Sequence, residues 1–133
     1  MRVALGLVFV MHGGQKLFVF GPAGVAGGMA ALGLPLPGLS AVLITAVELG
    51  GGIALLAGAF TRVSAFLIAG AMAVATVSAH LSSGFFMPSG FEYTLTLMLT
   101  SLAILMTGPG AYSVDSARVR PAKAETPAYP IAA

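Results

Sequence analysis

The chain contains no cysteine among its 133 residues. Without thiolates it cannot form disulfide bonds, hold an iron–sulfur cluster or attach haem covalently, and it offers no thiolate ligand to a metal. Charge is scarce as well, because only 8% of the residues are Asp, Glu, Lys or Arg. Soluble domains are about one-quarter charged, so this composition excludes an ordinary soluble enzyme. Any redox chemistry must therefore use a bound cofactor or a partner protein.

The few charges are unevenly distributed along the chain. Residues 115–133 contain half of them, which leaves five for the first 114 residues: Arg2, Lys16, Glu48, Arg62 and Glu92. The formal net charge is only +2 and the basic residues form no stripe, so nucleic acid is not an expected partner. The distribution instead predicts that residues 1–114 form a single domain dissolved in a lipid bilayer, followed by a polar tail over residues 115–133.

Hydrophobic residues make up 58% of the chain and gather in four segments, residues 3–20, 40–60, 63–83 and 91–107. Each has the length of about 20 residues that a helix needs to cross a bilayer core of about 30 Å. Proline and glycine separate the segments. A barrel would require alternating strands of about ten residues, which the sequence lacks. The first segment follows Arg2 as a signal peptide would, but no A-x-A cleavage site follows, so we expect it to remain. The sequence predicts an all-α, integral membrane four-helix bundle.

The basic residues indicate the orientation of the bundle. Four crossings bring Arg2, Arg62 and the basic tail residues Arg118, Arg120 and Lys123 to one side, which the positive-inside rule assigns to the cytoplasm. The N-terminus and C-terminus are therefore both expected inside. Six aromatic residues lie at the opposite ends of the segments, as in an interfacial belt: Phe18, Phe20, Phe85, Phe86, Phe91 and Tyr93. The first outer loop is apolar, and residues 23–32 are predicted to form a short interfacial or re-entrant helix.

Five ionisable side chains inside the predicted spans fall in the outer half of the membrane. Counting about 1.5 Å per residue from the cytoplasmic end of each span places them about 15–25 Å deep: His12, Lys16, Glu48, His80 and Glu92. A charge that faces lipid costs at least about 2.5–3.5 kcal/mol, so we expect these groups to turn inward and form one layer. Similar depths predict two pairs, Lys16 with Glu48 and His80 with Glu92. All five are candidate ligand-binding or proton-binding residues, with Gln15 and Thr96 as secondary candidates.

Each of these residues also has a purely structural interpretation. Lys16 can extend to the outer headgroups, and a buried Glu48–Lys16 pair can serve only to set the register of two helices. A hydrogen bond between His80 and Glu92 can simply tie the third helix to the fourth. Threonine hydroxyls in membrane helices commonly bond to the carbonyl four residues earlier. No His-x-x-x-His or Glu-x-x-His spacing is present, so no metal site is predicted.

An ordered set of motifs resembles the DoxX family of small bacterial membrane proteins. The similarity covers about residues 2–115 and is carried by residues 2–18, 32–35, 48–58, 61–62, 72–80, 84–86, 90–93, 108–110 and 113–115. The resemblance implies four transmembrane helices. It also implies a link to quinone-dependent chemistry at the membrane, since relatives are associated with thiosulfate:quinone oxidoreductase, with oxidant-defence oxidoreductase complexes and with catechol or quinone resistance.

Three hypotheses about function remain open from the sequence. The chain is either a small subunit that binds a quinone or small aromatic for a membrane oxidoreductase, a transporter that uses the Glu48–Lys16 pair, or a scaffold without a ligand. The expected setting is the bacterial plasma membrane, with lipid and redox-enzyme subunits as partners. The small residues of Ala54-x-x-x-Gly58 also suit a homo-oligomer contact.

Overall fold

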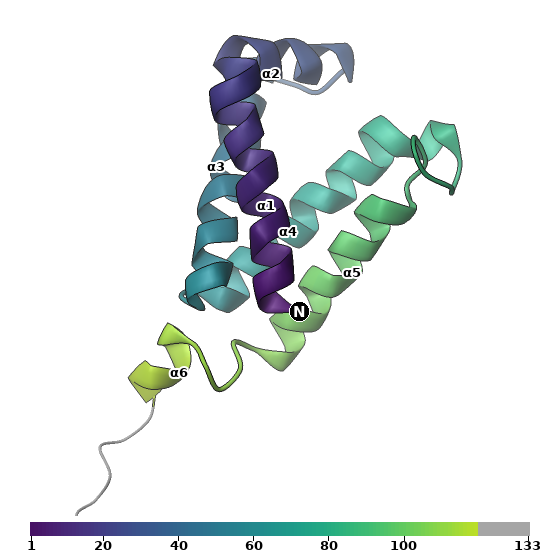
Figure 1. Cartoon of the computed structure of the whole chain (residues 1–133). Coiled ribbons are helices and arrows are strands. Elements are labelled where there is room, and N and C mark those ends of the chain that lie inside the picture. Colours follow the sequence, from purple (N-terminus) through teal and green to yellow (C-terminus); the bar gives the residue numbers. More distant parts are fainter. Residues whose placement is uncertain (120–133) are drawn as a thin grey trace, which may run out of the picture.

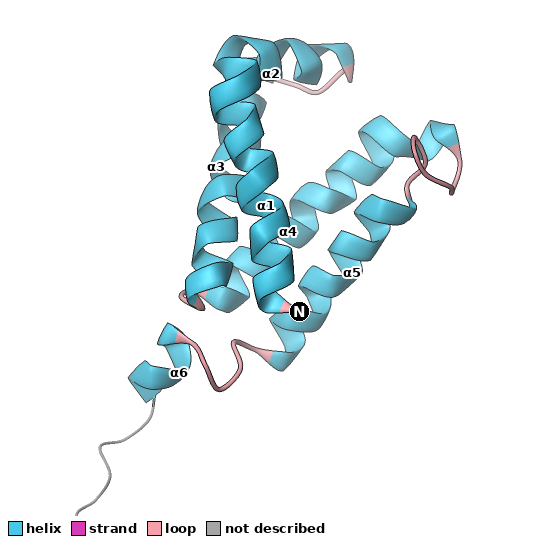
Figure 2. Ribbon diagram, in the orientation of Figure 1, coloured by secondary structure: helices cyan, strands magenta, loops and turns pink. Residues whose placement is uncertain are grey.

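The computed structural model describes residues 1–119, and these residues contain helices and no strand (Figure 2). The helices are α1 (Arg2–Gly14), the π-helix η1 (Gln15–Phe20), α2 (Gly21–Ala31), α3 (Pro37–Ala57), α4 (Thr61–Ala75), the π-helix η2 (Thr76–His80), the 3₁₀ turn η3 (Leu81–Ser83), α5 (Glu92–Thr107) and α6 (Val114–Val119). The basic residues Arg120 and Lys123 lie outside the described part of the chain.

Four helical segments run alternately up and down, as the sequence predicts (Figure 1). Three of them are long and apolar enough to cross a membrane, and α5, over Glu92–Thr107, is a shorter apolar helix. The all-helical membrane fold is therefore confirmed. The end of the bundle that contains the first residues of α1 and α4, together with α6, is assigned to the cytoplasm. This assignment stays a prediction, because it depends on the basic residues alone.

The short helix expected at residues 23–32 is present as α2. Gly21 separates it from η1 with φ 68° and ψ 165°, a conformation that a residue with a side chain rarely adopts. The chain turns there, and α2 lies across the ends of α1 and α3 (Figure 1). Its outer end returns to α3 through the segment that contains Pro35. Residues of this connection line the cavity between α2, α3 and α4 that is described below.

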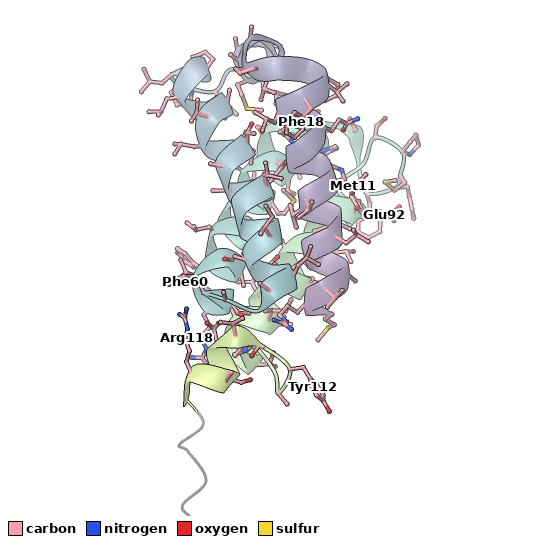
Figure 3. The ribbon with its side chains drawn as sticks, turned by 60° about the vertical axis from the view of Figure 1, so that its left-hand side comes forward. Met11, Phe18, Phe60, Glu92, Tyr112 and Arg118 are labelled. Atoms are coloured by element: carbon pink, nitrogen blue, oxygen red, sulfur yellow. The ribbon has the colours of Figure 1, made fainter. Side chains whose placement is uncertain are left out.

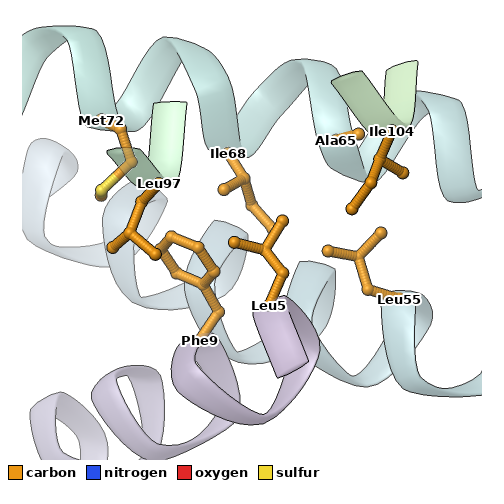
Figure 4. Packing of buried hydrophobic residues seen from close by; sticks show 8 residues of the cluster. All are labelled: Leu5, Phe9, Leu55, Ala65, Ile68, Met72, Leu97 and Ile104. Atoms are coloured by element: carbon orange, nitrogen blue, oxygen red, sulfur yellow. The ribbon is translucent and has the colours of Figure 1, made fainter. Parts of the chain in front are cut away.

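The bundle consists of two helix pairs that diverge toward the end where α2 lies. One pair is α1 with α3, and the other is α4 with α5 (Figure 1). The pairs meet at a small apolar core to which all four helices contribute, and Figure 4 shows Leu5 and Phe9 of α1 facing Ile68 of α4. The other members are Leu55, Ala65, Met72, Leu97 and Ile104. The two helix pairs are in contact at this core, and they separate toward the end where α2 lies.

Glycine lets α1 and α3 approach each other closely. A Cβ atom on Gly13 would lie 2.4 Å from the backbone nitrogen of Leu49, and one on Gly52 would lie 2.7 Å from the backbone nitrogen of Val10. Real Cβ atoms do not approach backbone atoms to these distances. Contacts through small residues replace the hydrophobic effect as the source of attraction between helices in lipid. The close packing of α1 against α3 therefore requires glycine, which has no side chain, at positions 13 and 52.

The N-terminus, the α3–α4 turn and α6 meet at the other end of the molecule. The Asp115 carboxylate accepts hydrogen bonds from the backbone N–H groups of Phe60 (3.0 Å) and Thr61 (2.9 Å), at the first turn of α4. Figure 3 shows Phe60 and Arg118 together at the end opposite Phe18, and the Arg118 guanidinium lies 5.9 Å from the centre of the Phe60 ring. The predicted tail begins at residue 115, and residues 115–119 of it are part of α6.

Protonation of Asp115 is expected to weaken this end of the protein. The hydrogen bond from the Thr61 backbone N–H is the main cause that holds the pKa of Asp115 below its ordinary value. A carboxyl group whose pKa is lower in the folded state stabilises that state above its unfolded pKa and loses this effect as the pH falls through the folded pKa. Wild type should therefore melt at a higher temperature than Asp115→Asn at pH 7, and the difference should begin to shrink at about pH 4 and be lost as the pH falls through the folded-state pKa below it. Melting followed by circular dichroism tests this, and a difference that is undiminished at pH 2 contradicts it.

Candidate functional site

Lys16 of η1 and Glu48 of α3 form an ion pair. The Nζ atom of Lys16 donates a hydrogen bond of 2.6 Å to Oε2 of Glu48. The side chain of Glu48 is only 4% exposed and that of Lys16 is 19% exposed. The predicted pairing of these residues is confirmed. Lys16 lies in the π-helical segment η1, and such turns often occur at functional sites.

The ion pair lies on the wall of a cavity of about 610 Å³ between α2, α3 and α4. This volume is within the range of small-molecule sites, about 300–1,000 Å³. Apart from the pair, the lining consists of apolar residues and two serines: Met29, Leu32, Leu34, Pro35, Ser40, Leu43, Ile44, Val47, Leu67, Gly70, Ala71, Val74, Ala75, Ser78 and Ala79. An apolar cavity with a few convergent polar groups is the usual form of a ligand site.

The polar chemistry of the cavity is concentrated at the ion pair. The Ser40 hydroxyl donates to the carbonyl oxygen of Pro35, and the Ser78 hydroxyl donates to that of Val74. Both serines therefore have their donor occupied within their own segments. Lys16 has three N–H donors, and Glu48 accepts one of them. The pair can thus offer a ligand both a hydrogen-bond donor and a carboxylate acceptor within one small region.

The predicted pairing of His80 with Glu92 is wrong. The Nδ1 atom of His80 lies 3.0 Å from the carbonyl oxygen of Ser89, and Oε1 of Glu92 accepts a hydrogen bond of 2.8 Å from the backbone N–H of Met87. Both side chains bind the backbone of the loop between η3 and α5. The loop is tight, so its backbone polar groups lie within hydrogen-bond distance of both side chains. His80 and Glu92 therefore hold the loop in place and do not line the cavity.

The other predicted members of the layer also lie apart from the ion pair. His12 is exposed on α1, and its Nδ1 lies 2.9 Å from the carbonyl oxygen of Val8 in the preceding turn. Gln15 is exposed in η1. The Thr96 hydroxyl donates to the carbonyl oxygen of Glu92, as the structural interpretation predicts. Within residues 1–119, no three His, Asp or Glu side chains gather as a metal site would require.

Sequence reasoning missed the cavity itself. Ala71, Ala75 and Ala79 form a row of small residues that, by spacing alone, indicates tight helix packing. In the structure all three line the cavity, because α4 diverges from α3, and Ala71 and Ala75 also pack against the shared apolar core. The apolar connection after α2 is the other signal, since a solvated loop has no need of its leucines and prolines. The alanine row and the apolar connection after α2 are therefore the two sequence signals of the cavity.

Comparisons with known proteins agree with the membrane fold. The family model described as DoxX matches residues 1–81. The chain is 34% identical over 115 residues to "Inner membrane protein YqjF" of Escherichia coli K12, covering 86% of this chain and 85% of that protein. It is 31% identical over 116 residues to "Putative oxidoreductase CatD" of Bacillus subtilis 168, covering 86% of this chain and 81% of that one. No solved structure matches the chain significantly.

Proposed function

Since the chain belongs to the DoxX family, we propose that it binds a quinone or a related small aromatic beside Lys16 and Glu48, as a membrane subunit of an oxidoreductase system. The observation that carries this proposal is the buried ion pair on the wall of an otherwise apolar cavity of about 610 Å³. A quinone is an apolar ring with carbonyl oxygens. The cavity offers apolar walls for the ring and Lys16 as a donor for a carbonyl oxygen.

The ion pair suits the chemistry that quinone reduction requires. Reduction to the quinol takes two electrons and two protons, and the charge that develops on a carbonyl oxygen is stabilised by a nearby cationic donor. Lys16 can donate this hydrogen bond and pass a proton to the reduced oxygen, Glu48 can hold Lys16 in place, and water supplies the second proton and replaces the one that Lys16 gives up. In the reverse reaction, oxidation of the quinol, Glu48 can accept a proton. Amino-acid side chains of this chain do not carry the electrons, so a partner subunit with its own redox cofactor supplies or removes them.

The names of the relatives favour the same setting. One is named as an oxidoreductase and another as an inner membrane protein. On this basis we place the chain in the bacterial inner membrane. The basic residues Arg2, Arg62 and Arg118 then put their end of the bundle, with the tail from residue 115, in the cytoplasm. The partner would be an enzyme of sulfur-compound oxidation or oxidant defence, the two settings that the family resemblance implies.

Quinone binding is expected to depend on the ion pair. A ligand present at 100 times its Kd stabilises the folded state by about 2.7 kcal/mol, so it raises the melting temperature. We expect decylubiquinone to stabilise wild type in lipid nanodiscs, and to bind the double variant Lys16→Met/Glu48→Leu at least about tenfold more weakly, which corresponds to about 1.4 kcal/mol. The double variant removes both charges and leaves none unpaired. Circular dichroism melting over a decylubiquinone titration measures both effects.

The matched control is Glu92→Gln, which removes a carboxylate outside the cavity. It should respond to decylubiquinone as wild type does. Equal stabilisation of all three proteins would move binding away from the ion pair, and stabilisation of none would overturn the proposal. In the second case, ion or phenol flux into proteoliposomes would favour the transporter hypothesis, and its absence would favour the scaffold.

A further inference from the structure

The cavity beside the ion pair is open toward the hydrocarbon of the bilayer. Four residues form its outward edge between α3 and α4, and we call them the lateral rim: Leu43, Leu67, Gly70 and Val74. Leu43 is 55% exposed, Leu67 46% and Val74 51%. Exposed apolar side chains on membrane helices contact lipid. Lipid therefore borders the cavity along this rim.

The lateral rim lies near the middle of the membrane. The helical stretch that contains Gly70 runs through α4, η2 and η3 from Thr61 to Ser83, 23 residues. At 1.5 Å per residue it is about 34 Å long, and Gly70 is about 14 Å from its first residue. The bilayer core is about 30 Å thick, so at this depth the surroundings are acyl chains. A molecule that passes the rim comes from the hydrocarbon and not from water.

Apolar residues lie at the end of the cavity nearest the membrane surface. Met29 of α2 and three residues of the following connection, Leu32, Leu34 and Pro35, line the cavity there. Figure 1 shows α2 lying across this end of the bundle. All four side chains are apolar, so they offer no path of polar groups for a dissolved solute. The lateral rim is open at Gly70. Glycine has no side chain there, and a Cβ atom at this position would meet nothing within 4 Å.

From this arrangement we infer that the ligand is a membrane-dissolved amphiphile, a quinone with an alkyl or isoprenoid tail, which enters sideways past Gly70, places its ring at Lys16 and Glu48, and leaves its tail among the lipids. This inference rests on the proposed function and adds the substrate class and the route. The tail gains little binding energy, because lipid is as apolar as the cavity wall. Its contribution is to concentrate the ring in the bilayer, at the depth of the rim.

Two photoreactive quinones test this geometry in nanodiscs. Both are decylubiquinone analogues, one with a diazirine on the ring and one with a diazirine at the end of the tail. We expect the ring probe to label Lys16 or Glu48 and the tail probe to label residues 67–74 or lipid. Tail labelling in residues 29–35 would overturn lateral entry while the proposed function stands. Absence of ring labelling at Lys16 and Glu48 would overturn the proposed function itself.

A bulky residue at the rim provides the second measurement. In Gly70→Phe, ring-probe labelling of the ion pair should fall at least tenfold, because the ring of phenylalanine occupies the entrance. The matched control is Gly50→Phe on α3, where a Cβ also meets nothing within 4 Å and which does not line the cavity. Labelling in the control should change less than twofold. Equal labelling in both variants would contradict entry past Gly70.

Discussion

We expect Lys16→Met to lower the free energy of unfolding by about 3–5 kcal/mol, because removal of one partner leaves the other as an uncompensated buried charge. The Glu48 side chain is 4% exposed, and the Nζ atom of Lys16 lies 2.6 Å from its Oε2. Without that cation the carboxylate remains on the wall of an apolar cavity. Reversible unfolding by SDS in mixed micelles, followed by circular dichroism, measures the loss.

The double variant Lys16→Met/Glu48→Leu should recover most of this loss. Replacement of a whole buried ion pair by apolar residues of similar size is often neutral or stabilising, since two desolvated charges disappear together. The comparison therefore separates the pair from its individual charges. If the single variant unfolds as wild type does, Glu48 is not buried with Lys16 as its partner. If the double variant is as unstable as the single one, the pair is needed for stability and the scaffold hypothesis gains support.

Gly13→Val is expected to have the second large effect. A Cβ at this position would lie 2.4 Å from the backbone nitrogen and 2.7 Å from the Cα atom of Leu49. Backbone atoms cannot move aside as a flexible side chain can, so α1 and α3 must separate. Overpacking of a tight interface costs about 1–3 kcal/mol, and a clash with backbone should fall at the upper end of this range. SDS unfolding again measures the loss.

Gly14→Val is a matched control for this variant. It makes the same substitution one residue away in the same helix, at a position where a Cβ meets nothing within 4 Å. The effect of valine on helix propensity is therefore common to both variants, and only Gly13→Val disturbs the α1–α3 contact. Similar stability of the two variants would show that the close approach of these helices is not needed for the fold.

The pairing of Lys16 with Glu48 could be predicted from the sequence, whereas the loop contacts that His80 and Glu92 make in place of their predicted pairing could not. Depth along a helix follows from residue count, because every residue rises by the same distance. Lys16 and Glu48 lie at similar depths on neighbouring helices and turn inward, so their side chains meet. His80 and Glu92 flank a tight loop whose carbonyl and N–H groups are closer than either side chain is to the other. Loop conformation is a matter of tertiary structure, and no count of residues reveals it.

The membrane fold followed from the sequence for a similar reason. In a bilayer the backbone must satisfy its own hydrogen bonds, so long apolar segments that lack the alternation of barrel strands have to form helices. The glycine–proline and proline breaks predicted α2 near its observed bounds, Gly21–Ala31. The contact of α6 with the first turn of α4 was not predicted, because Asp115 and Thr61 are far apart in the sequence and only folding brings them together.

The scarcity of charge therefore determined that the chain is a helical membrane protein, and the spacing of its rare ionisable residues determined that Lys16 and Glu48 meet. Both conclusions depend on distance along a helix, which sequence encodes directly. Only the tertiary structure decided that α4 diverges from α3, that α2 and the connection after it lie at the outer end of the space between them, and that the ion pair faces a cavity there. These features depend on the angles between helices, which the close α1–α3 contact and the small shared core set together.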